Sequence, residues 1–170
     1  MNKISFVATL LVAMVLSCCG YHLGGLRSGA MQNVQTFCVD MFENKTTHAL
    51  VSMQMTTALV DTLQRDGTFR LASRSEADVR IEGSVTNVAA SSLITNPDDS
   101  YISTEIGLRV IVAYKVIDCR TNKVLTYGTV SEEGSFFNDN TGNIQTAREA
   151  ALSYATRKAA ESIVNRLTIP

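Results

Sequence analysis

Two adjacent cysteines, Cys18 and Cys19, carry the most distinctive chemistry in this 170-residue chain, because they follow an apolar run and precede the segment Gly20–Gly25. Neighbouring cysteines rarely bridge each other, since the ring that their disulfide would close is strained. The pair also lacks the Cys-x-x-Cys spacing of redox and zinc sites. A site of covalent attachment explains the pair better.

The residues before this pair have the order of a signal peptide. A short basic start, Met1–Lys3, is followed by the apolar stretch Ile4–Val15, and small residues then precede the cysteines. The apolar stretch is shorter than the roughly 20 residues that a helix needs to span a bilayer. We therefore expect residues 1–18 to be a cleaved leader.

The residues around the cysteines match the end of a bacterial lipoprotein leader, which has leucine three residues before the cysteine that receives a diacylglyceryl group. Leu16 stands at that distance from Cys19. The register on Cys18 has the more usual serine, Ser17, directly before the cysteine. We favour Cys19 as the lipid attachment residue, with Cys18 as the alternative. Two or three acyl chains anchor a protein firmly, because each buried methylene contributes about 0.8 kcal/mol.

Neither candidate cysteine is followed directly by aspartate, so no retention signal for the inner membrane is present and the outer membrane is the expected destination. Two further cysteines, Cys38 and Cys119, remain in the mature chain. In an oxidising compartment they could form a disulfide or stay as two thiols, and the sequence leaves both alternatives open.

The other reactive side chains do not form a catalytic or metal-binding pattern. His22 and His48 lack cysteine or carboxylate neighbours at metal-ligand spacing. The carboxylate pairs Asp98–Asp99 and Glu132–Glu133 place their members on opposite sides of an extended chain. No nucleophile elbow, phosphate loop or dinucleotide fingerprint is present. We therefore expect no enzyme activity, no metal and no cofactor.

Composition and charge indicate a folded domain without an affinity for nucleic acid. Hydrophobic residues make up 45% of the chain and charged residues 18%, which is typical of a globular protein. The formal net charge is −1, and removal of the leader also removes Lys3 from the 15 basic residues, against 16 acidic ones. Such a chain has no positive field to recruit nucleic acid. We expect a lipidated N-terminus and tether over residues 19–33 and a single domain over residues 34–170.

Hydrophobic periodicity predicts two helices. The first runs from about Thr47 to Asp66, with Val51, Met55, Leu59 and Leu63 on one face, Asn44 or Thr46 as its cap, and Gly67 at its end. The second runs from about Ile144 to Leu167. Its apolar stripe is narrow and is made by Leu152, Ala155, Ala159, Ile163 and Leu167.

Extended segments are predicted at residues 34–42, 69–72, 79 to beyond 86, 102–117 and 124–133. From Val79 to Val85 apolar and polar residues alternate, and the phase then slips, which indicates a bulge near Asn87. Residues 95–100 read as a turn, and residues 118–123 as a hairpin loop with Asn122 in the left-handed conformation. The order β-α-β-β-β-α predicts an α+β fold, with two helices packed on one face of a mostly antiparallel four- to five-stranded sheet.

Several motifs, taken in order, resemble the LPS-assembly outer-membrane lipoprotein (LptE) family over nearly the whole mature chain. They begin with Cys19-Gly-Tyr-His-Leu-Gly-Gly25 and the Phe-x-Asn-x-Thr turn, here Phe42-Glu-Asn-Lys-Thr46. The stretch from Gly67-Thr-Phe-Arg-Leu71 to Asp78 and the long strand before Asp118 follow. The departure is Cys18, which stands where family members commonly have Gly or Ala.

The resemblance implies a non-enzymatic role and an α/β sandwich fold. Members of this family sit in the lumen of the LPS translocon LptD, a β-barrel of the outer membrane, where they act as a plug, help the barrel to assemble and contact lipopolysaccharide. The resemblance thus implies LptD and lipopolysaccharide as partners. The strand, turn and helix also resemble TolB-N-like and CsgG-like domains, so a lipid-anchored scaffold of another envelope machine is the alternative.

A contact with lipopolysaccharide calls for basic side chains on an exposed face. Arg109 and Lys115 lie six residues apart in one predicted strand, so both point to the same side, about 20 Å apart. Arg80 could join them from the neighbouring strand. These three residues are the expected lipopolysaccharide contacts, and an ordinary solvated sheet face is the alternative.

Overall fold

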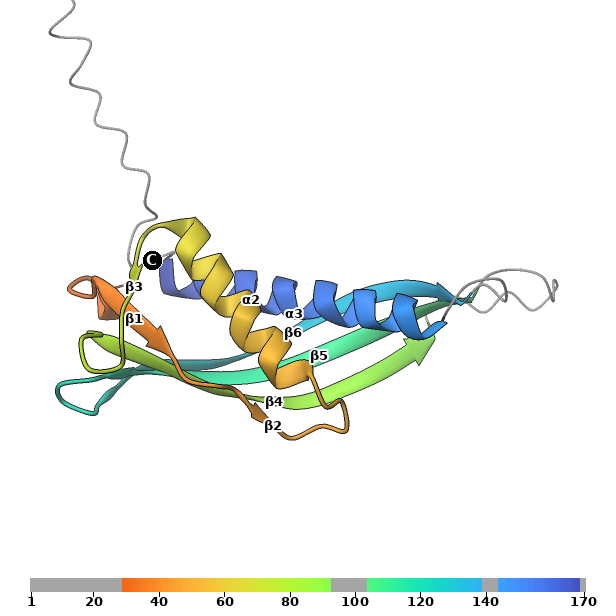
Figure 1. Cartoon of the computed structure of the whole chain (residues 1–170), viewed down its shortest axis with the longest axis horizontal. Coiled ribbons are helices and arrows are strands. Elements are labelled where there is room, and N and C mark those ends of the chain that lie inside the picture. The colour runs from red at the N-terminus through yellow and green to blue at the C-terminus, as the bar shows by residue number, and fades with distance from the viewer. Residues whose placement is uncertain (1–28, 93–103, 139–143, 169–170) are drawn as a thin grey trace, which may run out of the picture.

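The computed structural model describes residues 29–92, 104–138 and 144–168, which form one sheet and two long helices (Figure 1). The leader, the cysteines Cys18 and Cys19, and the turn expected at residues 95–100 lie outside these described residues. In chain order the elements are the 3-10 helix η1 (Gly29–Met31), β1 (Thr36–Val39), β2 (Glu43–Asn44), α2 (Val51–Asp66), β3 (Arg70–Leu71), β4 (Val79–Ser92), β5 (Thr104–Asp118), β6 (Val124–Asn138) and α3 (Ile144–Thr168).

The sheet has six strands in the order β3-β1-β4-β5-β6, and β2 also pairs with β4. The three long strands β4, β5 and β6 are antiparallel neighbours. In contrast, β1 runs parallel to β3 and β4, and β2 runs parallel to β4. The sheet is therefore mixed. The parallel pairing of β1 and β3 requires a crossover connection, and this connection contains α2.

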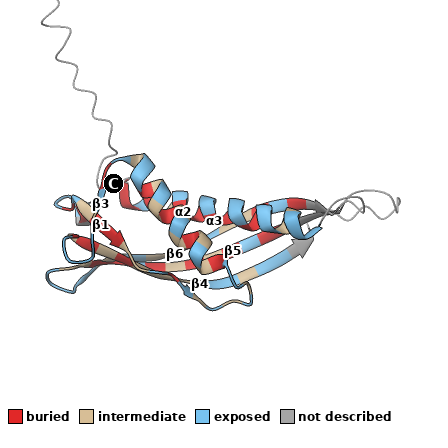
Figure 2. Cartoon of the chain, viewed as in Figure 1, coloured by how far each residue is buried: buried red, intermediate tan, exposed pale blue. Residues whose placement is uncertain are grey.

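Both helices cover the same face of the sheet, as predicted, and within the described residues no helix lies over the other face (Figure 1). The buried residues lie between the helices and the sheet (Figure 2). The α+β fold class expected from the sequence is confirmed. Among the described residues, neither helix combines the length and the apolar character that crossing a membrane requires.

Helix α2 buries the predicted stripe, because Val51, Met55, Leu59 and Leu63 are all fully buried. Its C-terminal end also agrees with the prediction, since Gly67 adopts a left-handed φ of 72° and its N–H donates to the Leu63 carbonyl. The predicted start and cap were wrong. The helix begins at Val51, after Leu50, and no side chain caps it.

Helix α3 packs on the sheet through small residues. Ala155 and Ala159 are fully buried, and so are Ile163 and Leu167 further along the helix. At Gly134 of β6 the helix lies so near that an added Cβ would collide with the Ala151 carbonyl oxygen of the helix. The narrow stripe seen in the sequence thus lets the helix lie almost directly on β6.

Two predicted irregularities of the long strands are confirmed. The register between β4 and β5 shifts between Val85 and Asn87, so the bulge lies where the phase slip placed it. The hairpin between β5 and β6 contains Asn122 with a φ of 54°, the left-handed conformation. β6 is longer than predicted and extends to Asn138.

A single carboxylate ties the short strand β1 to the start of β4. Asp78 Oδ2 accepts hydrogen bonds from the Gln35 and Thr36 backbone N–H groups and from the Thr36 hydroxyl, each at 3.0 Å. The Thr36 hydroxyl oxygen in turn accepts the Asp78 N–H at 2.9 Å. These bonds, the Gln35 backbone bond first, lower the pKa of Asp78 below its ordinary value, although partial burial acts in the opposite direction.

Candidate functional site

The three expected contact residues all lie on the face of the sheet that the helices leave open. In β5 the buried residues Leu108 to Val116 alternate with the exposed Arg109 and Lys115, so both basic side chains point away from the core. Arg80 of β4 also alternates with buried neighbours, Val79 and Ile81. The shared orientation predicted from the sequence is thus present.

At one end of this face the basic residues belong to a chain of ion pairs. Glu82 lies between two of them, because its carboxylate contacts the Arg80 Nε at 2.5 Å and the Lys115 Nζ at 2.9 Å. Arg80 also lies 3.9 Å from Asp40, which contacts Arg74 at 3.1 Å. The hydrogen bond from Lys115, followed by the bond from Arg80, lowers the pKa of Glu82. The hydrogen bond to Glu82 raises the pKa of Arg80.

Arg109 does not belong to this group of ion pairs. It precedes Lys115 by six residues in β5 and pairs with Glu133 of β6 at 3.2 Å. The structure therefore brings Arg80 and Lys115 together through Glu82 but does not bring Arg109 to them. Each of the three basic residues has a carboxylate partner. Around these three residues the exposed face therefore has paired charges of opposite sign and does not form a basic patch.

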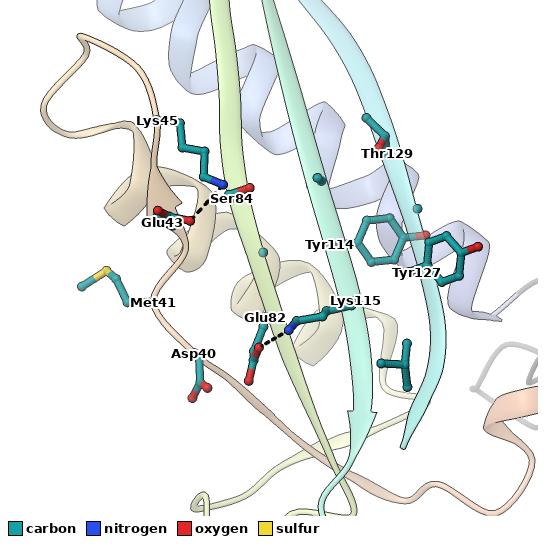
Figure 3. Close-up of a pocket in the computed structure, with 14 residues that line it drawn as sticks. Asp40, Met41, Glu43, Lys45, Glu82, Ser84, Tyr114, Lys115, Tyr127 and Thr129 are labelled. Atoms are coloured by element: carbon teal, nitrogen blue, oxygen red, sulfur yellow. Dashed lines mark ion pairs between the residues drawn. The ribbon is translucent and has the colours of Figure 1, made fainter. Parts of the chain in front are cut away.

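A shallow hollow of about 810 Å³ lies on the same face (Figure 3). Its floor is made by short side chains and glycine backbone, including Ser84 and Ala113, and the Glu82–Lys115 pair crosses it. Met41 on one side and Tyr127 on the other form its walls, and their exposed fractions are 69% and 80%. Sequence reasoning missed both, because Met41 lies in the short connection between β1 and β2 and Tyr127 is a single exposed residue of β6, so neither belongs to a periodic pattern.

The described residues offer no metal site, since no group of three or more His, Cys, Asp or Glu side chains gathers among them. Cys38 and Cys119 are both free thiols in the structure. Burial of the Cys38 side chain, followed by the proximity of Cys119 and Asp40, raises the pKa of the Cys38 thiol. Strand β4 lies between β1, which carries Cys38, and β5, after which Cys119 follows.

The Phe-x-Asn-x-Thr turn owes its shape to Asn44. The Asn44 Oδ1 accepts hydrogen bonds from the Thr46 N–H at 2.9 Å and the Thr46 hydroxyl at 2.8 Å, and its amide donates to the His48 carbonyl at 2.7 Å. His48 then lies 3.5 Å from Arg148 of α3. Burial of the imidazole, followed by the Arg148 charge, lowers the pKa of His48. The motif therefore orders the turn before α2 and does not cap the helix.

Solved structures with a similar fold were found at low sequence identity. The hypothetical protein CT253 from Chlamydia trachomatis superposes with a TM-score of 0.58 at 9% identity, covering 79% of this chain and 96% of that one. Protein XCC0632 from Xanthomonas campestris superposes with a TM-score of 0.56 at 10% identity, covering 85% and 90%. At this identity the likeness concerns the fold alone.

No curated protein matches this chain in sequence. The model of one protein family does match, and its description is LptE, lipopolysaccharide-assembly. The match covers residues 34–167, which is nearly the whole of the fold described above. This family consists of non-enzymatic assembly lipoproteins of the Gram-negative outer membrane, in agreement with the absence of a catalytic pattern in the sequence. The chain belongs to the LptE lipopolysaccharide-assembly family.

Proposed function

We propose that this protein acts in the lumen of a β-barrel LPS translocon of the LptD type, as a plug and as an assembly partner of the barrel. The observation that carries this proposal is the family match over residues 34–167. The leader and the cysteines that follow it support it as well, because they suit a lipoprotein of the outer membrane. The body then faces the periplasm or lies inside the barrel.

In this proposal Cys19 carries the acyl chains, with Cys18 as the alternative. The leader comprises residues 1–18, and residues 19–33 connect the lipid to the folded body that extends to residue 170. Within this connection, Met31 is already buried against the body. The connection between lipid and body is therefore short.

Affinity purification of the full chain from detergent-solubilised outer membranes tests the proposal. We expect a barrel protein of the LptD type to be recovered in about equal amount with the tagged chain, and mass spectrometry of the mature N-terminus to find the acyl groups on Cys19. An unrelated outer-membrane lipoprotein with the same tag is the control. Recovery of no such barrel, or of components of another envelope machine only, would contradict the proposal.

We further propose that Arg109, Lys115 and Arg80 contact the phosphates of lipopolysaccharide by exchanging their carboxylate partners for the lipid. Arg109 and Lys115 are suited to this exchange, because their side chains are 55% and 49% exposed. The Arg80 side chain is only 22% exposed and lies between Asp40 and Glu82, so its part is smaller. Exposed ion pairs are weak and are readily exchanged.

Removing a carboxylate and removing its basic partner should have opposite effects on lipopolysaccharide binding. Arg109→Gln and Lys115→Gln should each weaken binding by about fivefold, since an exposed ion pair contributes up to about 1 kcal/mol. Glu133→Gln should strengthen binding, because it leaves Arg109 without its competing carboxylate. Binding of purified lipopolysaccharide to the full chain in detergent provides the measurement.

The matched control is Arg157→Gln, which removes an exposed arginine from α3 on the opposite side of the sheet. This variant should bind lipopolysaccharide like the unmodified chain. Equal binding by all four variants would mean that this sheet face only meets solvent or protein.

A further inference from the structure

The hollow on the open face of the sheet lies over a row of short side chains. Strand register places one residue of β4, one of β5 and one of β6 side by side in this row: Ser84, Ala113 and Thr129. The next row on the same face, two residues along each strand, has longer side chains: Glu82, Lys115 and Tyr127. The hollow therefore runs across the strands, and its depth is the difference in length between the two rows.

Exposed apolar side chains gather at this hollow. Met41, Val124 and Tyr127 are among the few large hydrophobic side chains that are exposed in the described part of the chain, and all three line it. Met41 lies at one end and Tyr127 at the other (Figure 3). The volume of about 810 Å³ is within the range of roughly 300–1,000 Å³ that ligand-binding clefts have. Such a gathering of apolar side chains marks a binding surface.

Two ammonium groups at the hollow can leave their carboxylate partners. Lys45 pairs with Glu43 at 3.2 Å, and both side chains are more than half exposed, at 52% and 68%. Lys115 pairs with Oε2 of Glu82 at 2.9 Å. When Lys115 leaves, Glu82 keeps a basic partner, because Arg80 contacts the other oxygen, Oε1. Exposed pairs of this kind are weak, so both ammonium groups are able to bind an external anion.

We propose that the hollow binds an acyl chain of lipopolysaccharide, while the Lys115 ammonium, released from Glu82, binds a phosphate of the same lipid. This inference rests on the phosphate contacts proposed above and adds the part of the lipid that the hollow receives. An acyl chain gains free energy with each methylene that leaves water, and an ammonium group binds phosphate as a point charge. An apolar hollow with releasable ammonium groups beside it matches both parts of such an amphiphile.

The shape of the hollow favours a flexible chain over a side chain of a partner protein. An anchoring side chain at a protein interface fills a well-packed pocket. This hollow is shallow and continues across three strands, so a long chain can lie along the row of Ser84, Ala113 and Thr129. Met41 at its end has an unbranched thioether side chain, which adapts readily to the chain beside it.

Tryptophan fluorescence tests which part of the lipid enters the hollow. The chain contains no tryptophan, so Tyr127→Trp places a single reporter at the hollow. The full chain is purified in a bile-salt detergent, which has no flexible alkyl chain that could occupy the site. Intact lipopolysaccharide should shift the emission to shorter wavelength, because the acyl chain displaces water from the indole ring. Fully deacylated lipopolysaccharide retains its phosphates and should bind, as measured by calorimetry, without this shift.

The matched control is Tyr154→Trp, which replaces an exposed tyrosine of α3 on the side of the helices. Its emission should not change with either form of the lipid. An equal shift in both variants would overturn the proposal. Binding of intact lipopolysaccharide without a shift in Tyr127→Trp would also overturn it.

Filling the hollow should weaken binding of the acylated lipid alone. Ala113→Phe should lower the affinity for intact lipopolysaccharide about tenfold, as expected when roughly two methylene groups lose their contacts, and leave the deacylated form unchanged. Ser131→Phe is the control, because Ser131 is an exposed residue of β6 on the same face but outside the hollow. Met41→Ser removes one end of the hollow at an exposed position outside the strands. It should weaken binding of the acylated lipid in the same way, and it does not depend on Ala113→Phe being folded.

The same variants separate this inference from the proposed function. Lys115→Gln should weaken binding of both forms of the lipid. If it does so while Ala113→Phe and Met41→Ser weaken neither, the phosphate contact stands and the acyl site is overturned. Both hollow variants should still recover the barrel in affinity purification. Loss of the barrel with unchanged lipid binding would mean that a protein segment occupies the hollow, which would overturn the acyl site as well.

Discussion

Replacing Gly134 by alanine is expected to lower the free energy of unfolding by about 3 kcal/mol. The added Cβ would collide with the Ala151 carbonyl oxygen, which belongs to the helix backbone. A flexible side chain could rotate away, but a helix backbone moves only if α3 lifts from the sheet. That movement would open the contacts of the buried Ala155 and Ala159.

Urea or thermal unfolding of the purified chain measures this loss. Gly29→Ala is the matched control, because a Cβ at Gly29 meets no atom within 4 Å. It should change the unfolding free energy by no more than about 0.5 kcal/mol. Equal stabilities of the two variants would mean that α3 does not lie directly on β6.

The second large effect is expected at Asp78. Asp78→Ala removes the acceptor of three hydrogen bonds and leaves the Gln35 and Thr36 N–H groups without it, at a cost of about 2–3 kcal/mol. Because these bonds hold β1 against β4, the loss should appear first as faster hydrogen exchange in β1. Asp61→Ala, at an exposed position of α2, is the control and should leave stability nearly unchanged.

The Asp78 contribution should also depend on pH. The pKa of Asp78 in the folded state lies below the ordinary value of 3.8, so the unfolded chain takes up its proton first as the pH falls. The contribution is therefore complete well above pH 3.8 and is lost as the pH falls through the lower folded pKa. The stability difference between the unmodified chain and Asp78→Asn should shrink in that range. A difference that stays constant down to pH 2 would contradict this role of the carboxylate.

Much of the fold could be predicted from local patterns. The helix stripe that starts at Val51, the bulge at Asn87 and the left-handed Asn122 each depend on residues within about one turn or one strand. Hydrophobic periodicity and backbone preferences report such features directly. The predicted cap failed for a related reason. Asn44 has the right side chain for a cap, but it is used in its own turn, seven residues before the helix begins.

For the candidate site, the sequence predicted which basic residues share a face but not which carboxylates they pair with. Alternation showed that Arg109, Lys115 and Arg80 share a face, because a strand places every second side chain on the same side. It could not show their partners. Glu82 faces Lys115 and Glu133 faces Arg109 only through the register of strands that are far apart in the sequence. The neutralised face and the hollow between Met41 and Tyr127 thus became visible only in the folded chain.

The sequence by itself determined the order of the helices and long strands and the motifs of the LptE family, and the prediction of a leader with two candidate lipid cysteines depends on it alone. All of these are properties of neighbouring residues. Tertiary structure alone decided that β1 and β4 run parallel, that α3 lies on Gly134, and that Arg80, Arg109 and Lys115 each have a carboxylate partner. These features depend on strand register and helix placement. Register is set when the whole core packs, and no short stretch of the chain contains that information.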